Sequence, residues 1–319
     1  MTFLSHTARI ALLTAFATPA LADLGPLVTP AELAAALQND APLVLDIRAP
    51  KAPADKPDEP NFAAGHIPGA LSAPYGAFRG PESNPGAVPD AAKLTEVLQG
   101  LGVTADRPVV ITHQGTDATD FGAAARVYWT LKSSGVTEVS ILNGGVAAWS
   151  EAGQPLSKDA AAPVPSTFEV SFSDEWLATT ADVEKVVNGE DKALLLDARP
   201  EEFWAGDKAH GAAARPGTLP QSRYFTHSNW FGEGAATIDA AKVVELAKAE
   251  GFIKDEQLIS FCNTGHWAAT NWFALSELAG IDNVKLYPDS MVAWSQTDNA
   301  MDNVPGLFRN LWNQVTGIF

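Results

Sequence analysis

The chain contains the same series of sequence signals twice, in the same order and at a nearly constant spacing. A short apolar run that ends in Asp and Arg occurs at residues 42–48 and again at residues 193–199. Farther along, Cys262 follows another apolar run, and His113 lies 149 residues earlier at the corresponding place. Unrelated segments would not keep one order and one spacing, so the sequence predicts a duplicated domain.

The pairing extends through most of the chain. Further pairs are residues 65–74 with 214–222, 107–117 with 256–266, and 144–153 with 289–296. Short apolar runs that end in polar residues are typical of buried parallel strands. Helical patterns lie between them: Thr29 and Glu32 form a predicted capping box, and Thr180 is expected to cap the matching helix. The sequence therefore predicts an α/β fold with two domains, each a mostly parallel sheet flanked by helices on both faces.

The first 22 residues have the pattern of an export signal. An apolar stretch at 10–17 is followed by Ala20-Leu21-Ala22, and this stretch is too short to span a membrane as an anchor. We therefore expect cleavage after Ala22 and a periplasmic protein. The whole chain carries 38 acidic and 21 basic residues, and such an acidic surface repels nucleic acid and anionic lipid.

Composition also predicts the domain boundaries. After the signal peptide (1–22) we expect a first domain at 23–157, a linker rich in Ala and Pro at 158–167, and a second domain at 168–300. Residues 301–319 are predicted to form an amphipathic helix with its apolar residues on one face. That face would dock on the protein itself, or contact a partner or a membrane.

Cys262 is the only cysteine in 319 residues, so it cannot form an internal disulfide. It is either a buried small hydrophobe or a reactive thiol. It follows a predicted strand, and ligands of parallel sheets bind beyond the carboxyl ends of strands. The loop between this strand and the next helix can direct several backbone N–H groups to one point, which would stabilise a thiolate or an anionic sulfur. We expect Cys262 to be the nucleophile and the loop to bind an anion through Asn263, Thr264, Gly265, His266 and Trp267.

The segments LVLDIR, GHIPGA, NGGVAAW, LLLDAR and CNTGHW follow one another along the chain and extend over most of it after residue 22. In this order they resemble the tandem-domain rhodaneses of the sulfurtransferase family. In such proteins the second domain usually carries the persulfide-forming cysteine and the first lacks it, in agreement with Cys262 and His113. The resemblance implies transfer of a sulfane sulfur from a small anion such as thiosulfate to cyanide or a thiol through a Cys262 persulfide, with no cofactor and no metal.

The basic residues of the predicted site depart from the family pattern. Many sulfurtransferases that prefer thiosulfate place a basic side chain just after the cysteine, whereas here His266 is the nearest ionisable group. A protonated imidazole would help to bind a dianion, but histidine titrates near neutrality, so this help would fade as the pH rises. Arg199 and Arg215 are further candidates for substrate contact, although burial beside a carboxylate is the favoured interpretation of Arg199. Other bases that might line the site are Lys208, His210 and Arg223.

Other cysteine chemistries fit less well. A cysteine phosphatase needs Arg at the sixth position after the cysteine, where this chain has Ala268, and a thiol oxidoreductase needs a second cysteine. Two alternatives stay open beside the thiosulfate enzyme: a 3-mercaptopyruvate sulfurtransferase, and an exported carrier that passes the persulfide sulfur of Cys262 to a partner protein.

Overall fold

The computed structural model describes residues 24–39, 42–232, 235–252 and 256–306. The first half contains β1 (Leu27–Val28), α1 (Pro30–Ala36), β2 (Leu43–Asp46), η1 (Phe62–Ala64), β3 (Leu71–Ser72), η2 (Tyr75–Phe78), α2 (Ala91–Gly100), β4 (Val109–Thr112), α3 (Ala118–Ser133), β5 (Val139–Leu142) and α4 (Gly145–Glu151). The second half contains α5 (Thr180–Val187), β6 (Leu194–Asp197), α6 (Glu201–Trp204), β7 (Arg223–Tyr224), η3 (His227–Trp230), α7 (Ala240–Ala249), β8 (Leu258–Phe261), α8 (Trp267–Phe273), the π-helical η4 (Ala274–Leu278), β9 (Val284–Leu286) and α9 (Ser290–Trp294).

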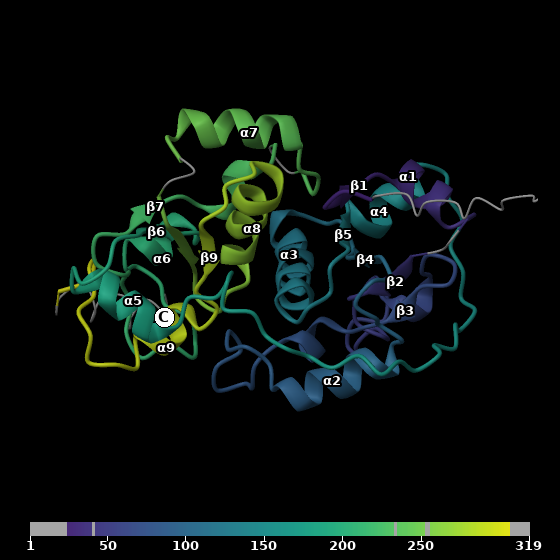
Figure 1. Cartoon of the computed structure of the whole chain (residues 1–319), viewed down its shortest axis with the longest axis horizontal. Helices are drawn as coiled ribbons and strands as arrows, with labels where there is room; N and C mark the ends of the chain where they lie inside the picture. The colour runs from purple at the N-terminus through teal and green to yellow at the C-terminus, as the bar shows by residue number, and fades with distance from the viewer. Residues whose placement is uncertain (1–23, 40–41, 233–234, 253–255, 307–319) are drawn as a thin grey trace, which may run out of the picture.

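Each half is built around one parallel sheet (Figure 1). The strand order is β1-β5-β4-β2-β3 in the first sheet and β7-β6-β8-β9 in the second. Within the sheets every strand pair is parallel. The strand that ends at the Asp of Asp-x-Arg is β2 in the first sheet and β6 in the second. It lies between a two-residue edge strand (β3 or β7) and the strand that leads to His113 or Cys262 (β4 or β8). The predicted α/β fold with two similar domains is confirmed.

Local sequence explains where the helices begin. Thr29 caps α1 through a capping box with Glu32, as predicted. In the second half the cap is Thr179 rather than Thr180, because Thr179 has the extended backbone and accepts a hydrogen bond from the amide of Asp182. The neighbouring Thr180 is the first helical residue, so the prediction was wrong by one position.

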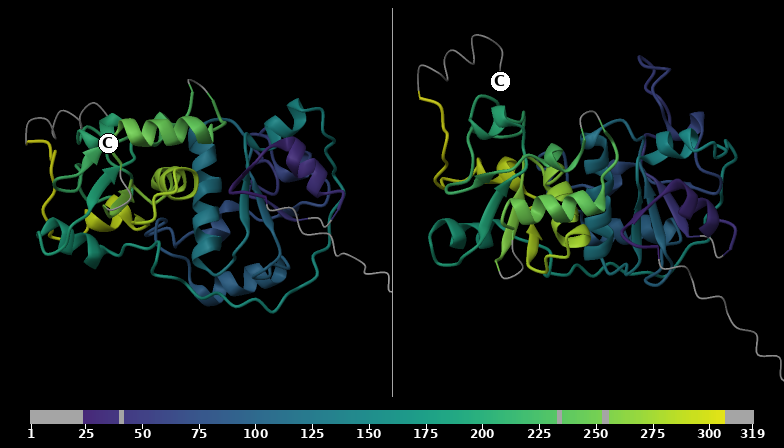
Figure 2. Two further views of the ribbon diagram at one scale, coloured as in Figure 1. Left: turned by 45° about the horizontal axis from the view of Figure 1, so that its top comes forward. Right: turned by 90° about the horizontal axis from the view of Figure 1, so that it is seen from above.

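The two halves meet along α3 and α8, which run side by side between the sheets (Figures 1 and 2). Most of α3 is buried, and one cluster of apolar side chains continues from one half into the other. A Cβ on Gly122 of α3 would come within 3.0 Å of the His266 imidazole, so glycine permits this close approach. Lys132 also pairs across the interface with Glu277 at 2.7 Å. The halves therefore share a continuous core.

Several predicted segments lie at the ends of the chain or between its halves. The predicted export signal at 1–22 lies outside the described residues, and so does most of the predicted C-terminal helix. Residues 301–306 are not helical, and Asp302 instead pairs with Thr218 in an antiparallel bridge. Residues 158–167, the predicted linker, contain no helix or strand. Across the described ranges, no helix is both long and apolar enough to cross a membrane.

Candidate active site

Cys262 lies directly after β8, at the carboxyl end of the second sheet. Its side chain is 1% exposed and forms part of the wall of a cavity of about 220 Å³. This cavity is lined by Arg79, Thr119, His210, Cys262, Asn263, Thr264, His266 and Trp267. Two of these residues, Arg79 and Thr119, belong to the first half, so the two halves form the cavity together.

Residues 262–266, which we call the cysteine loop, are held from behind by the start of α9. The amides of Met291 and Val292 donate to the carbonyl oxygens of Cys262 and Asn263, at 3.1 and 3.0 Å. The Ser290 hydroxyl accepts from the amides of Cys262 and Gly265, at 3.0 and 3.2 Å. These contacts fix the backbone of the loop and bind its first two carbonyl groups.

The next two carbonyl groups of the cysteine loop are bound by arginines of the first half. Arg79 donates to the Thr264 carbonyl oxygen at 3.1 Å. Arg126, in α3, lies 3.5 Å from the same oxygen and 3.4 Å from the Gly265 carbonyl oxygen. Each carbonyl from Cys262 to Gly265 therefore has a donor.

The amides of the cysteine loop are used differently. In the part of the chain that the structure describes, the N–H groups of Asn263, Thr264 and His266 have no acceptor among the hydrogen bonds of the protein. Buried backbone N–H groups are nearly always paired. A loop with several free backbone donors is suited to bind an anion.

The corresponding loop of the first half shows what this backbone binds. Its amides at Gly115 and Thr116 donate to the carboxylate of Asp120, the latter at 3.0 Å, and His113 Nδ1 lies 2.9 Å from the same oxygen. Burial opposes ionisation of Asp120, but hydrogen bonds from His113, Thr116 and Gly115 outweigh it and lower its pKa to about 2. The first copy of the loop thus holds an internal anion.

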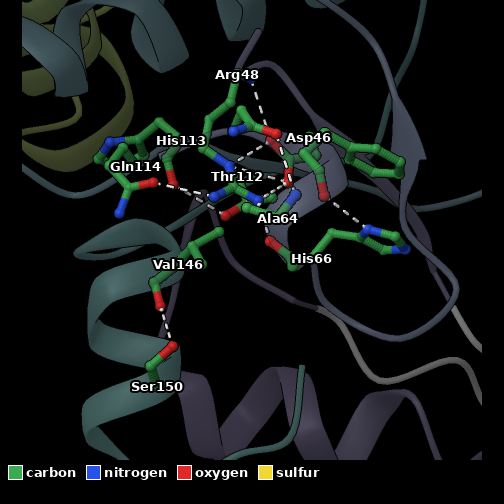
Figure 3. A network of polar contacts seen from close by, with 12 residues as sticks. Asp46, Arg48, Ala64, His66, Thr112, His113, Gln114, Val146 and Ser150 are labelled. Atoms are coloured by element: carbon green, nitrogen blue, oxygen red, sulfur yellow. Dashed lines mark hydrogen bonds and ion pairs between the residues drawn. The ribbon is translucent and has the colours of Figure 1, made fainter. Parts of the chain in front are cut away.

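The supports of the two loops also correspond. In the first half, Arg48 pairs with Asp46 at 2.6 Å and donates to the Gln114 side chain at 3.0 Å (Figure 3). In the second half, Arg199 pairs with Asp197 at 2.6 Å and donates to the Asn263 side chain at 3.3 Å. Arg199 is buried behind the cysteine loop, as the favoured interpretation of the sequence has it.

The other predicted arginine does not reach the cavity either. Arg215 donates to the carbonyl oxygens of Ser295, Thr297 and Asn299 at 3.1, 2.7 and 3.2 Å. Neither Arg199 nor Arg215 lines the cavity. Both side chains bind other groups of the protein in this structure: Arg199 the Asp197 carboxylate, and Arg215 backbone carbonyls.

His266 lies in the cavity wall, but it is not the expected cation. Its Nε2 donates to the Thr119 carbonyl oxygen at 2.8 Å, and its Nδ1 accepts from the Tyr75 hydroxyl at 2.7 Å. Because a carbonyl can only accept, these partners assign the proton to Nε2. Burial and the nearby guanidinium of Arg79 lower the pKa of His266 to about 3, so the imidazole is neutral near pH 7.

Arg79 places a positive charge in the wall of the cavity that contains Cys262. Its guanidinium lies 4.9 Å from the centre of the Tyr75 ring and donates to the Pro85 carbonyl oxygen at 2.6 Å. No ion pair of the described residues includes Arg79. Arg79 is far from Cys262 in the sequence, so its place in the site was missed. The sequence feature that could have pointed to it is a difference between the copies: Arg79 follows η2, whereas Phe231 follows the equivalent η3.

The remaining predicted residues have clear positions. His210 lines the cavity, and burial followed by the charge of Arg79 lowers its pKa. Lys208 lies over the Phe203 ring and Arg223 pairs with Glu250, and neither of them lines the cavity. Trp267 forms part of the cavity wall and is stacked on His227, with 5.2 Å between the ring centres.

The fold and this site together define a tandem α/β protein that can hold an anionic sulfur on one cysteine, between a loop of one half and arginines of the other. The chain belongs to the rhodanese-like domain family, which matches residues 29–152 and 179–297. The tandem-rhodanese resemblance inferred from the sequence motifs is thereby confirmed.

Three similar proteins illustrate the relationship. The sulfur carrier protein TtuD of Thermus thermophilus is 26% identical over 211 residues, which cover 63% of this chain and 73% of TtuD. A thiosulfate sulfurtransferase of Pseudomonas aeruginosa is 28% identical over 281 residues, 88% of this chain and 96% of that protein. The crystal structure of SseA from Escherichia coli, described as a 3-mercaptopyruvate sulfotransferase, superposes with a TM-score of 0.68 at 24% identity and covers 83% of this chain and 98% of SseA.

Proposed function

We propose that the protein is a sulfurtransferase that moves a sulfane sulfur from thiosulfate, or a similar small anion, to cyanide or a thiol through a persulfide on Cys262. One observation carries the proposal. Three amides of the cysteine loop, those of Asn263, Thr264 and His266, have no acceptor in the described protein, whereas two amides of the equivalent loop of the first half bind the Asp120 carboxylate. The second copy is therefore prepared to receive an anion at the position of its cysteine.

The chemistry takes place at the Cys262 sulfur. In the first step the thiolate attacks the outer sulfur of thiosulfate, a new S–S bond forms, and sulfite leaves with the electron pair of the broken S–S bond. Cys262 then carries a terminal anionic sulfur. In the second step the carbon of cyanide attacks this sulfur, thiocyanate leaves, and the Cys262 thiolate is restored.

The residues of the cavity divide the work of stabilising charge. The free amides of Asn263, Thr264 and His266 donate to the negative sulfur, as preorganised donors do at other developing anions. Arg79 attracts the anionic donor to the cavity mouth. His266 is neutral and joins Tyr75 to Thr119, so it positions the wall instead of carrying charge.

The named relatives support sulfur transfer in general and leave the natural donor and acceptor open. Similarity to the thiosulfate sulfurtransferase of Pseudomonas aeruginosa favours the small-molecule reaction. Similarity to the sulfur carrier protein TtuD favours a second candidate, in which the persulfide passes to a partner protein. The likeness to SseA makes 3-mercaptopyruvate the next donor to test. We also propose export to the periplasm, from the signal pattern of residues 1–22.

The test is the intact mass of the protein after incubation with thiosulfate and then with cyanide. The wild type should gain one sulfur atom, lose it to cyanide and release thiocyanate, while Cys262→Ser should gain none. If thiosulfate adds no sulfur but 3-mercaptopyruvate does, the reaction class stands and the donor changes. If neither donor loads Cys262 and a protein persulfide does, the carrier function replaces the enzyme. If no donor of any kind loads Cys262, sulfur transfer is refuted.

A further inference from the structure

We propose that Arg126, which belongs to the half without the nucleophile, is a positioning residue that stabilises negative charge on the Cys262 sulfur through the peptide groups of the cysteine loop. The inference rests on the proposed function, because it concerns the same sulfur. It adds a role for the first half of the chain beyond lining the cavity.

Arg126 lies in the middle of α3 and is fully buried. Its guanidinium donates to the carbonyl oxygens of Gly86 and Ala87, at 2.9 and 3.2 Å. On its other side it meets the carbonyl oxygens of Thr264 and Gly265, at 3.5 and 3.4 Å. The side chain therefore joins a first-half segment to the back of the cysteine loop.

No carboxylate of the described residues forms a direct ion pair with Arg126, and the more distant carboxylate of Asp289 favours its charge only in part. The Nε of Arg126 has no hydrogen-bond partner among the described residues. Burial and then the charge of Arg79 lower its pKa to about 10, so it stays protonated at neutral pH. A buried cation without a counter-charge is costly. An anionic sulfur on Cys262 supplies that counter-charge.

The contacts also explain how the charge reaches the sulfur. The Gly265 carbonyl and the His266 N–H belong to one peptide group, and a cation at the oxygen makes that N–H a stronger donor. The His266 N–H is one of the free amides of the cysteine loop. The first-half loop needs no such cation, because the Asp120 carboxylate already matches its amides. The residue that corresponds to Arg126 in the second half is accordingly apolar, Leu275.

Several titratable groups lie in the cavity of Cys262 or interact with Cys262 or Arg126, and they set the background for a measurement. They are Tyr75 and Arg79 from η2 and its end, Arg126 from α3, His210, His266, and Asp289 before α9. His266 is neutral above pH 5 and Arg126 stays charged well below pH 10, so neither group changes its charge near neutral pH.

The experiment is the thiolate absorbance near 240 nm as a function of pH, with Cys262→Ser subtracted as the blank, since the chain has one cysteine. In Arg126→Met the midpoint should rise by about one pH unit or more, which is about tenfold less thiolate below the midpoint. Arg126→Lys should shift it less, because the charge is retained. The control Lys132→Met removes another first-half cation that crosses the interface, paired with Glu277, and should leave the midpoint unchanged.

An unchanged midpoint in folded Arg126→Met would overturn the proposal. If that variant does not fold, the comparison of Arg126→Lys with Arg126→Gln replaces it, because both side chains are polar and only one is charged. Equal midpoints in these two would likewise overturn it. The titration needs no sulfur donor, so it gives an answer even if Cys262 never accepts sulfur, and normal sulfur transfer with an unshifted titration would refute the role of Arg126 alone.

Discussion

Replacement of Arg79 tests whether the first half recognises the anionic donor. Of the five N–H groups of its guanidinium, one each goes to the Pro85 carbonyl, the Tyr75 hydroxyl and the Thr264 carbonyl. Two N–H groups and the whole positive charge remain for a ligand in the cavity beside Cys262. We therefore expect Arg79→Met to slow the binding and reaction of thiosulfate at Cys262 far more than any later step.

The structure sets the size of this effect. A hydrogen bond to a charged group contributes about 1.5 to 3 kcal/mol. Arg79 is partly exposed, so water screens the interaction and favours the lower end of this range. That end corresponds to a loss of about 10- to 30-fold in kcat/KM.

The assay is the steady-state formation of thiocyanate with thiosulfate as the varied substrate. Arg79→Met should raise KM, while Arg79→Lys should recover much of the loss because it retains the charge. Arg223→Met is the matched control, since this arginine is paired with Glu250 and does not line the cavity. The reaction of preloaded Cys262 persulfide with cyanide should slow less than the loading step. A kcat/KM for thiosulfate within twofold of wild type in Arg79→Met would refute the assignment.

Three further predictions follow from the loops and their charges. Asp120→Asn should lower the free energy of unfolding near pH 7 by about 2 kcal/mol, because the carboxylate has its pKa lowered to about 2. This contribution is present above the unfolded-state pKa and is lost as pH falls towards 2, so urea denaturation should show the difference shrinking below about pH 4; a constant difference would contradict the argument. Gly265→Ala should abolish sulfur loading, because a Cβ there would lie 2.5 Å from Arg126 and the backbone has a φ of +63°. Intact mass measures the loading, and circular dichroism should show that the variant is folded. Finally, the pH dependence of sulfur transfer should contain no step from His266 between pH 5.5 and 8, and a step that disappears in His266→Gln would show that the imidazole titrates in that range after all.

The sequence was sufficient for the fold because the fold depends on local and repeated signals. Each apolar run that ends in Asp-x-Arg became a parallel strand, and Thr29 began its helix as predicted. The cysteine loop could be placed for the same reason, since a strand, a short turn and a helix follow each other directly around Cys262. Such signals need only a few neighbouring residues.

The missing parts of the site depend on contacts between the halves. Arg79 and Arg126 reach the cysteine loop from segments more than a hundred residues earlier, and nothing in their local sequence points to Cys262. The repeated strand end and the loop after it pointed instead to Arg199 and Arg215, which bind a carboxylate and backbone carbonyls. The protonation state of His266 could not be predicted from the sequence either, because it depends on burial and on the charge of Arg79, which lower its pKa.

The Asp120 carboxylate in the first-half loop has a consequence for stoichiometry. A duplicated fold with two open loops would bind two anions per chain, and inhibition curves would then contain contributions from both sites. Here the first loop is already saturated by a tethered group, whose effective concentration no solute anion can match. Sulfite, sulfate and other oxyanions should therefore compete at a single site, and calorimetric titration should saturate at one equivalent per chain. The two copies of the loop therefore differ: one has free amides for an anion, and the amides of the other are already bound by Asp120.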